Sequence, residues 1–116
     1  MDFEKFSFGS ITIDGVTYKN DVIIDRGDIR KRKKKPSKRF REQYGHTPVS
    51  VEEAIPWKCR RLVIGTGSYG SLPVMDEVKR EARRRRVEIL IVPTEEAIEK
   101  LAQKPKYTNA ILHVTC

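Results

Sequence analysis

The first quarter of the chain has the hydrophobic pattern of an antiparallel hairpin. The dipeptide Asp14-Gly15 favours a two-residue turn, and both of its flanks are rich in β-branched and aromatic residues. On the second flank, alternate positions are apolar, namely Val16, Tyr18, Val22 and Ile24. On the first flank the alternation slips at Gly9, where one bulged residue would restore the register. We therefore expect a hairpin over residues 6–24 with a bulge at Gly9, followed by a turn at residues 26–28.

The second half of the chain changes to short apolar runs that alternate with amphipathic helices. Apolar runs predict strands at residues 62–64, 88–92 and 110–114. Apolar residues at helical spacing predict one helix over residues 74–86 and another over 94–104, the second with Ala97, Ile98, Leu101 and Ala102 facing inward. A capping-box pattern at residues 50–53 predicts a short helix that ends at Pro56, and Thr94 is expected to cap the last helix, which Pro105 ends.

This order of elements predicts a three-layer α/β fold with a mixed sheet. Strand, helix, strand, helix and strand in succession imply parallel pairing through right-handed crossovers, with the helices packed on the sheet. The N-terminal hairpin must then extend or cover that sheet. The chain of 116 residues has the length of one domain, so we expect a single domain over residues 1–116, with a basic loop at residues 30–44 between its two halves.

The positive charge is concentrated in that loop. The chain carries 24 Lys and Arg against 16 Asp and Glu, a net charge of +8, and nine of the basic residues lie between Arg30 and Arg41 with no acidic residue among them. Such a segment is typical of a phosphate-binding arm with aromatic residues for stacking, and equally of a solvated loop. The candidate polyanion-binding residues are Arg30, Lys31, Arg32, Lys33, Lys34, Lys35, Lys38, Arg39, Phe40, Arg41 and Tyr44.

A glycine-rich motif follows the first strand of the second half. The sequence Gly65-Thr66-Gly67-Ser68-Tyr69-Gly70 satisfies G-x-G-x-x-G, which holds a dinucleotide pyrophosphate in some α/β folds. The next strand ends in Val92-Pro93-Thr94, without the acidic residue that would hold a ribose hydroxyl, and Pro73 delays the helix. We therefore interpret the glycines as a tight connection close to neighbouring backbone. The alternative that the loop amides bind a smaller anion stays open. The candidate ligand-binding residues are Gly65, Thr66, Gly67, Ser68, Gly70 and Thr94.

Catalytic and metal-binding patterns are weak. Ser68 lacks the glycine context of a nucleophile elbow, and His113 and Cys116 lie three apart on an extended segment, so they point to opposite faces. We expect His113 to be a hydrogen-bonded core histidine, and we expect no metal site. The arginines at residues 83–86 are explained by the helix dipole and by ion pairs of Asp76 with Arg80 and of Glu81 with Arg85.

Other sequence features predict a cytoplasmic protein without a membrane segment. No apolar run approaches the roughly 20 residues that span a bilayer, and the first residues are too acidic for a targeting peptide. The two cysteines, Cys59 and Cys116, are too few for a disulfide framework, so we expect reduced thiols.

Segments along nearly the whole chain resemble one family. It is the small α/β domain family of the adipogenesis-associated domain-containing protein, a mitochondrial complex I assembly factor and stand-alone archaeal and bacterial proteins. The resemblance is carried by Phe8-Gly9-Ser10-Ile11, Tyr18, Asp21-Val22-Ile23-Ile24, Tyr44-Gly45-His46, Val63-Ile64-Gly65-Thr66-Gly67, Pro93-Thr94-Glu95-Glu96-Ala97-Ile98 and Leu112-His113-Val114-Thr115-Cys116. It implies a three-layer α/β fold with a mixed sheet, a poorly defined function, and neither catalytic residues nor a cofactor. The resemblance implies an assembly or regulatory role, as in the eukaryotic members. This chain departs from those members by its lack of a transit segment and by its long basic stretch, which looks more like that of archaeal members, so a role in complex I assembly does not carry over.

Three functions follow as hypotheses. The first is a non-enzymatic binding, assembly or regulatory module that acts on an unknown protein partner as a monomer or weak homodimer. The second is weak binding of nucleic acid or another polyanion through the basic loop. The third is an enzyme that acts on a phosphorylated small molecule held at the glycine loop.

Overall fold

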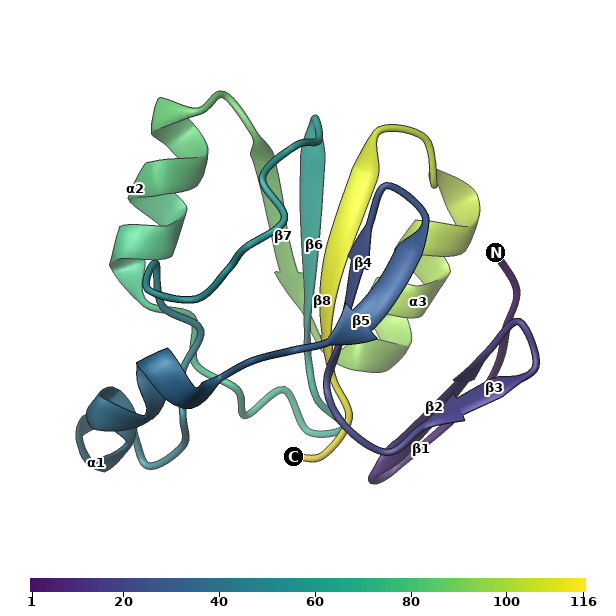
Figure 1. Ribbon diagram of the computed structural model, residues 1–116, viewed down its shortest axis with the longest axis horizontal. Coiled ribbons are helices and arrows are strands. Elements are labelled where there is room, and N and C mark those ends of the chain that lie inside the picture. The colour runs from purple at the N-terminus through teal and green to yellow at the C-terminus, as the bar shows by residue number, and fades with distance from the viewer.

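The Asp14-Gly15 turn forms as predicted, within a three-stranded antiparallel sheet. The computed structural model describes residues 1–116, and β1 (Phe3–Ser7), β2 (Ser10–Ile13) and β3 (Val16–Tyr18) lie in that order in the small sheet (Figure 1). The expected bulge at Gly9 is wrong, because Gly9 lies in the turn between β1 and β2 with φ 90°. The out-of-phase phenylalanines and isoleucines of the first flank therefore belong to two different strands.

The single strand expected over residues 16–24 is also divided. The chain leaves the small sheet after β3, passes through the exposed Lys19 and Asn20, and enters a second sheet as β4 (Val22–Asp25). β4 pairs with β5 (Asp28–Lys31) around a turn in which Arg26 and Gly27 both have positive φ. The predicted turn at residues 26–28 is thus present, and the chain changes sheets at the exposed polar pair Lys19-Asn20.

The second sheet has five strands and confirms the predicted crossovers. Its order is β5-β4-β8-β6-β7, where β6 (Arg61–Thr66) pairs in parallel with both β7 (Glu88–Val92) and β8 (Thr108–His113), and β4 is antiparallel to β8. The parallel strands are connected by α2 (Asp76–Arg84) and α3 (Thr94–Gln103), which occupy opposite sides of the sheet (Figure 1). The mixed α/β fold agrees with the prediction.

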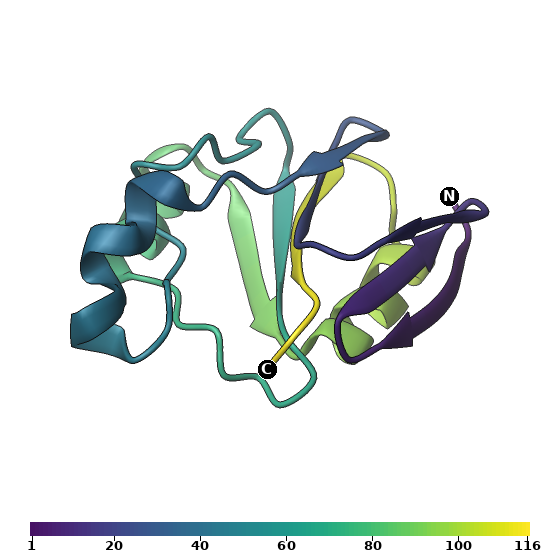
Figure 2. The same ribbon diagram turned by 60° about the horizontal axis from the view of Figure 1, so that its bottom comes forward.

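Alternating residues of the central strands supply two cores. Val63 packs on the face that α3 and the small sheet cover, together with Ile11 and Leu101. Its neighbours Leu62 and Ile64 pack on the other face, with Val78 of α2. The small sheet therefore covers one end of the α3 face, as Figure 2 also shows, while β4 and β5 extend the large sheet.

The helices differ from the predictions at their ends. α2 starts at Asp76 because Val74 forms an isolated bridge with Val49. In α3, Ala97 and Leu101 are buried as expected, but Ala102 is exposed. No helix is both long and apolar enough to cross a membrane.

The basic segment is folded, whereas a loop was expected over residues 30–44. After β5 it forms a 3-10 helix, η1 (Lys35–Phe40), and a short helix, α1 (Arg41–Tyr44), which ends at Gly45 with φ 76°. Figures 1 and 2 show these turns beside α2, on the same side of the five-stranded sheet. The segment is held there by two buried residues, Arg32 and Ser37.

Candidate functional site

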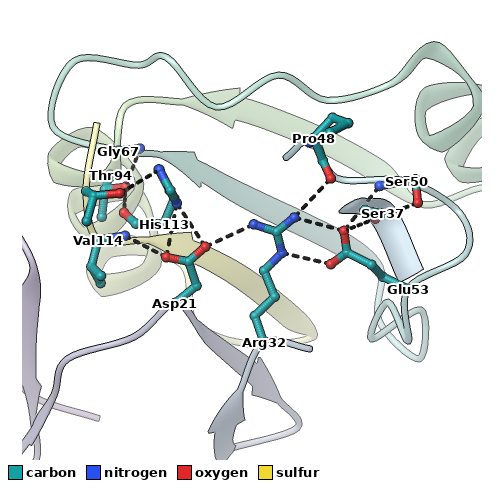
Figure 3. A network of polar contacts seen from close by, with 11 residues as sticks. Asp21, Arg32, Ser37, Pro48, Ser50, Glu53, Gly67, Thr94, His113 and Val114 are labelled. Atoms are coloured by element: carbon teal, nitrogen blue, oxygen red, sulfur yellow. Dashed lines mark hydrogen bonds and ion pairs between the residues drawn. The ribbon is translucent and has the colours of Figure 1, made fainter. Parts of the chain in front are cut away.

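Asp21 and His113 meet because their strands are antiparallel neighbours. Val22 of β4 is paired with Leu112 of β8, which places the preceding residue, Asp21, opposite the following one, His113. The Asp21 carboxylate lies 2.8 and 3.0 Å from His113 Nδ1 and accepts a 3.0 Å hydrogen bond from the Val114 amide (Figure 3). Both side chains are largely buried. His113 is therefore a hydrogen-bonded buried histidine, as predicted, but its partner is a carboxylate.

Arg32 continues the network from the same carboxylate. Its Nη1 donates to Asp21 at 2.9 Å, its Nη2 donates to the Pro48 carbonyl at 3.0 Å, and the side chain is fully buried. Its Nε and Nη2 bind the two oxygens of Glu53, each at 2.8 Å (Figure 3). The guanidinium thus uses its planar fork in the bidentate manner that Arg allows and Lys does not.

Glu53 connects this pair to the basic segment. Ser37 of η1 donates to Glu53 Oε2 at 2.5 Å and lies 2.6 Å from the Ser50 hydroxyl. The capping-box hydrogen bonds of residues 50–53 are present, since Ser50 Oγ accepts from the Glu52 amide and the Ser50 amide donates to Glu53. The predicted helix is nevertheless wrong. The Glu53 carboxylate accepts hydrogen bonds from Arg32 and Ser37, and residues 51–53 make only a turn.

Burial and ion pairing act in opposite directions on these groups. Burial alone would raise the pKa of the Asp21 carboxyl. The hydrogen bond and the charge of His113, the hydrogen bond from the Val114 amide and the charge of Arg32 together lower the pKa below its ordinary value. For Arg32, burial would lower the pKa, and the hydrogen bonds and charges of Glu53 and Asp21 raise it. Asp21 and Arg32 are thus held in their charged forms.

A hollow of about 240 Å³ opens beside this network, at the ends of β8 and of the loop that follows β6. Open α/β sheets commonly bind ligands at this end of their parallel strands. We call it the basic hollow, and its lining residues are Arg32, Lys34, Lys38, Arg41, His46, Thr47, Leu72, His113 and Thr115. Among its cations, Lys34, Lys38 and Arg41 form no salt bridge. Three exposed positive charges without a carboxylate partner therefore surround one concave surface.

Thr115 lines the hollow together with His113. In an extended segment residues two apart share a face, and Thr115 Oγ1 lies 3.1 Å from His113 Nε2. A smaller hollow of about 130 Å³, lined by Lys19, Lys31, Lys34 and Thr115 among others, adjoins it. The partly exposed Thr115 therefore lies where two basic concavities meet.

The glycine loop has a structural role. Gly67 and Gly70 have positive φ, and a Cβ on Gly67 would overlap the backbone of Cys116. A Cβ on Gly65 would lie 2.9 Å from Thr94 Oγ1. The interpretation of the motif as a tight connection close to neighbouring backbone is therefore confirmed.

The loop amides are not open to an anion. Gly67 N donates to Thr94 Oγ1 at 2.8 Å, Ser68 N to the Thr115 carbonyl at 2.8 Å, and the next three amides also have protein acceptors. Thr94 Oγ1 in turn donates to the His113 carbonyl at 2.6 Å. The expected cap at Thr94 is wrong, because Pro93 is the N-cap and the Thr94 hydroxyl joins the glycine loop to β8. The geometry thus moves the candidate site from Gly65, Thr66, Gly67, Ser68, Gly70 and Thr94 to the basic hollow.

The polyanion candidates of the basic segment divide into three groups. Lys34, Lys38 and Arg41 line the basic hollow, and Lys31 lines the adjoining one. The arginines with carboxylate partners are Arg30 with Asp25, Arg32 with Asp21 and Glu53, and Arg39 with Glu52. Lys33, Lys35, Phe40 and Tyr44 line neither hollow, and the Arg39 guanidinium lies 4.7 Å from the centroid of the Phe40 ring.

Sequence reasoning missed the residues that complete the site. Asp21, His46, Thr47, Glu53 and Thr115 were not selected, although His113 and Thr115 two apart at the end of a strand were a usable signal. Of the two ion pairs predicted on α2, Glu81 with Arg85 is confirmed at 2.7 Å, while Arg80 pairs with Glu77 instead of Asp76. The arginines at residues 83–86 thus belong in part to local ion pairs.

Comparison with known proteins agrees with this fold without adding an activity. A family model described as a protein of unknown function (DUF498/DUF598) matches residues 3–113. The chain is similar to the crystal structure of the conserved hypothetical protein PH1505 from Pyrococcus horikoshii OT3, with 29% identity, 100% of both chains covered and a TM-score of 0.82. It is also similar to MT938, with 28% identity, 98% of this chain and 97% of that chain covered and a TM-score of 0.70.

A more distant structure shows the fold alone. A protein from Bordetella pertussis, described as a Mth938-like domain, has 15% identity, covers 97% of this chain and 84% of its own, and gives a TM-score of 0.63. No curated protein matches the chain.

Proposed function

Since this chain belongs to the DUF498/DUF598 family of proteins of unknown function, we propose its function from the site itself: a module that binds a phosphate-bearing polyanion in the basic hollow. The observation that carries the proposal is the convergence of Lys34, Lys38 and Arg41, all without carboxylate partners, on one hollow of about 240 Å³. Like charges held close together repel, and a bound polyanion relieves that repulsion.

The buried network supports binding because it fixes where these cations stand. Arg32 and Ser37 are anchored to Glu53, and these anchors bracket Lys34 and precede Lys38. A preorganised site loses less conformational entropy on binding than a flexible arm. The exposed lysines are therefore presented by a folded segment.

We consider two classes of partner, a protein and a nucleic acid. A protein partner would make the module an assembly or regulatory factor, the role implied by the resemblance to eukaryotic family members. A nucleic-acid partner would be held through its phosphates with little base preference, because no element is positioned to read base edges. In both settings we propose one domain over residues 1–116 that acts in the cytoplasm as a monomer or weak homodimer.

The test measures binding of labelled single-stranded and duplex oligonucleotides and of inorganic polyphosphate at several salt concentrations. The variant Lys34→Gln/Lys38→Gln/Arg41→Gln removes three charges from the hollow. The variant Lys79→Gln/Arg83→Gln/Arg86→Gln removes three exposed charges from α2 and its end, so the net charge of the two variants is equal. If all three hollow residues contact phosphates, their loss reduces the log-log salt slope on duplex DNA by about 2.7 and weakens binding at 0.1 M salt on the order of a hundredfold.

The α2 variant is the control that distinguishes a specific binding site from an effect of net charge. We expect the α2 variant to bind within about threefold of the parent protein, because none of its three substituted residues lines the hollow. Equal weakening in both variants would contradict the proposal and leave only a diffuse effect of net charge. Absence of binding by the parent protein at low salt would contradict it as well.

A further inference from the structure

The hydrogen bonds around His113 fix which ring nitrogen carries its proton. The Asp21 carboxylate is ionised and can only accept, so His113 Nδ1 carries the hydrogen that it donates at 2.8 Å. With Nδ1 protonated, neutral imidazole leaves a lone pair on Nε2. The Thr115 hydroxyl, 3.1 Å from Nε2, is then the donor in the second hydrogen bond. Hydroxyl, imidazole and carboxylate thus form a chain in the proton arrangement that activates a hydroxyl nucleophile.

Burial decreases along this hydrogen-bonded chain from Asp21 to Thr115. The Asp21 side chain is 9% exposed and the His113 side chain 11% exposed, while Thr115 is partly exposed and lines both hollows. The carboxylate and the base are therefore shielded from water, while Thr115 lies at the surface of both hollows.

The cations of the basic hollow suit phosphoryl transfer, a reaction whose transition state carries negative charge. In phosphoryl transfer the negative charge spreads over the phosphoryl oxygens, and the protein contributes mainly positioning and positive charge. Lys34, Lys38 and Arg41 supply that charge around Thr115. We propose that Thr115 is the nucleophile of a phosphomonoester hydrolase, with His113 as general base and acid and Asp21 as the residue that positions it. This inference rests on the anion site of the proposed function and extends it from binding to chemistry.

The reaction balances with water as its only co-reactant. Thr115 Oγ1 forms a bond to phosphorus, its proton passes to His113 Nε2, and the ester P–O bond breaks as His113 returns that proton to the leaving oxygen. Water then attacks the phosphothreonine, giving its proton to His113. The bond between Thr115 Oγ1 and phosphorus breaks, and His113 returns the proton to the threonine oxygen, which releases inorganic phosphate.

The experiment follows hydrolysis of p-nitrophenyl phosphate by the full chain and maps acid-quenched samples for phosphothreonine by mass spectrometry. Thr115→Val keeps the side-chain shape and removes the hydroxyl, and His113→Gln removes the base. We expect each to lower turnover by about 10² to 10⁴. Thr115→Ser should retain activity, and Thr17→Val, which alters an exposed threonine of β3, should leave the rate unchanged. A phosphoryl group mapped to Thr115 in the parent protein and absent from Thr115→Val supports the assignment.

A parallel titration with inorganic phosphate separates the two proposals. Phosphate binding together with turnover equal to that of Thr115→Val overturns the hydrolase and leaves the binding module standing. Failure of both phosphate and polyphosphate to bind overturns the anion site, and the hydrolase with it. Turnover that persists in Thr115→Val and disappears in His113→Gln also overturns the assignment of Thr115 as nucleophile.

Discussion

The carboxylate of Asp21 and the imidazole of His113 meet at 2.8 Å across two antiparallel strands, β4 and β8. The same carboxylate accepts from Arg32, whose guanidinium is shared with Glu53. One buried network therefore joins the edge hairpin, the central strand and the basic segment. The scaffold of the candidate site and part of the stability of the fold rest on the same few ionised groups.

The Asp21→Asn variant should be destabilised by about 3 kcal/mol at pH 7, because it leaves the buried charge of Arg32 with a weaker set of partners. Urea unfolding followed by circular dichroism measures the loss. Val16→Thr, at an exposed position of β3, is the control and should change the free energy of unfolding by less than about 0.5 kcal/mol.

The parent protein and Asp21→Asn should also differ in how the free energy of unfolding depends on pH. The folded-state pKa of Asp21 lies below its ordinary value of 3.8, so the ionised carboxyl stabilises the fold fully above that value. The contribution is lost as the pH falls from the ordinary pKa through the lower folded-state pKa. The difference between the parent protein and Asp21→Asn should therefore shrink as the pH falls below about 4. A difference that did not shrink below pH 4 would contradict the ion-pair assignment.

The Arg32→Lys variant keeps the charge and loses the planar fork. We expect a loss of roughly 2–3 kcal/mol, because an ammonium group cannot bind both Glu53 oxygens, Asp21 and the Pro48 carbonyl together. Hydrogen exchange at the Ser37 amide should speed up with it, since that amide bonds Lys34 in the anchored segment. Unchanged exchange would mean that Arg32 does not hold the segment in place.

Gly67→Ala tests the glycine loop. Gly67 has φ 100°, and a Cβ there would lie 2.7 Å from the Thr115 carbonyl oxygen and overlap the Cys116 backbone, so we expect a loss of roughly 3 kcal/mol. Gly45→Ala, with φ 76° and no neighbour within 4 Å, isolates the backbone strain and should cost about 1 kcal/mol. Equal losses in thermal unfolding would show that the close approach at Gly67 is unimportant.

Thr94→Val tests the hydroxyl that bridges the glycine loop and β8. The variant leaves the Gly67 amide and the His113 carbonyl without their buried partner, so we expect a loss of about 1–3 kcal/mol. Thr94→Ser restores both hydrogen bonds and should recover most of the stability measured by urea unfolding. If serine were as damaging as valine, the methyl group would matter and the bridge would not.

The crossover half of the fold could be predicted from the sequence because its signals are local. Apolar runs marked β6, β7 and β8, and the helical spacing of Val78 with Ala82 marked α2. The N-terminal half was predicted less well, since Val16 and Ile24 alternate in phase although they lie in different sheets. Alternation reports which face of a strand is apolar, and it does not report which sheet the strand joins.

The site could be predicted only in part, because its residues meet through pairings that no local pattern encodes. The basic segment supplied Lys34, Lys38 and Arg41 to the candidates, but nothing local brought Asp21 to His113, which is 92 residues away. The burial of Arg32 was likewise hidden, because its partner Glu53 matched a capping box and was assigned to a helix end.

Titration of uniformly ¹⁵N-labelled protein with inorganic phosphate, read by amide chemical shifts, tests the anion site most directly. We predict saturable shifts at Lys34, Lys38, Arg41, His46, His113 and Thr115, and their loss in Lys34→Gln/Lys38→Gln/Arg41→Gln. Shifts confined to residues 65–70 or to residues 83–86, or an absence of saturable shifts at millimolar phosphate and low salt, would contradict the basic hollow as the anion site.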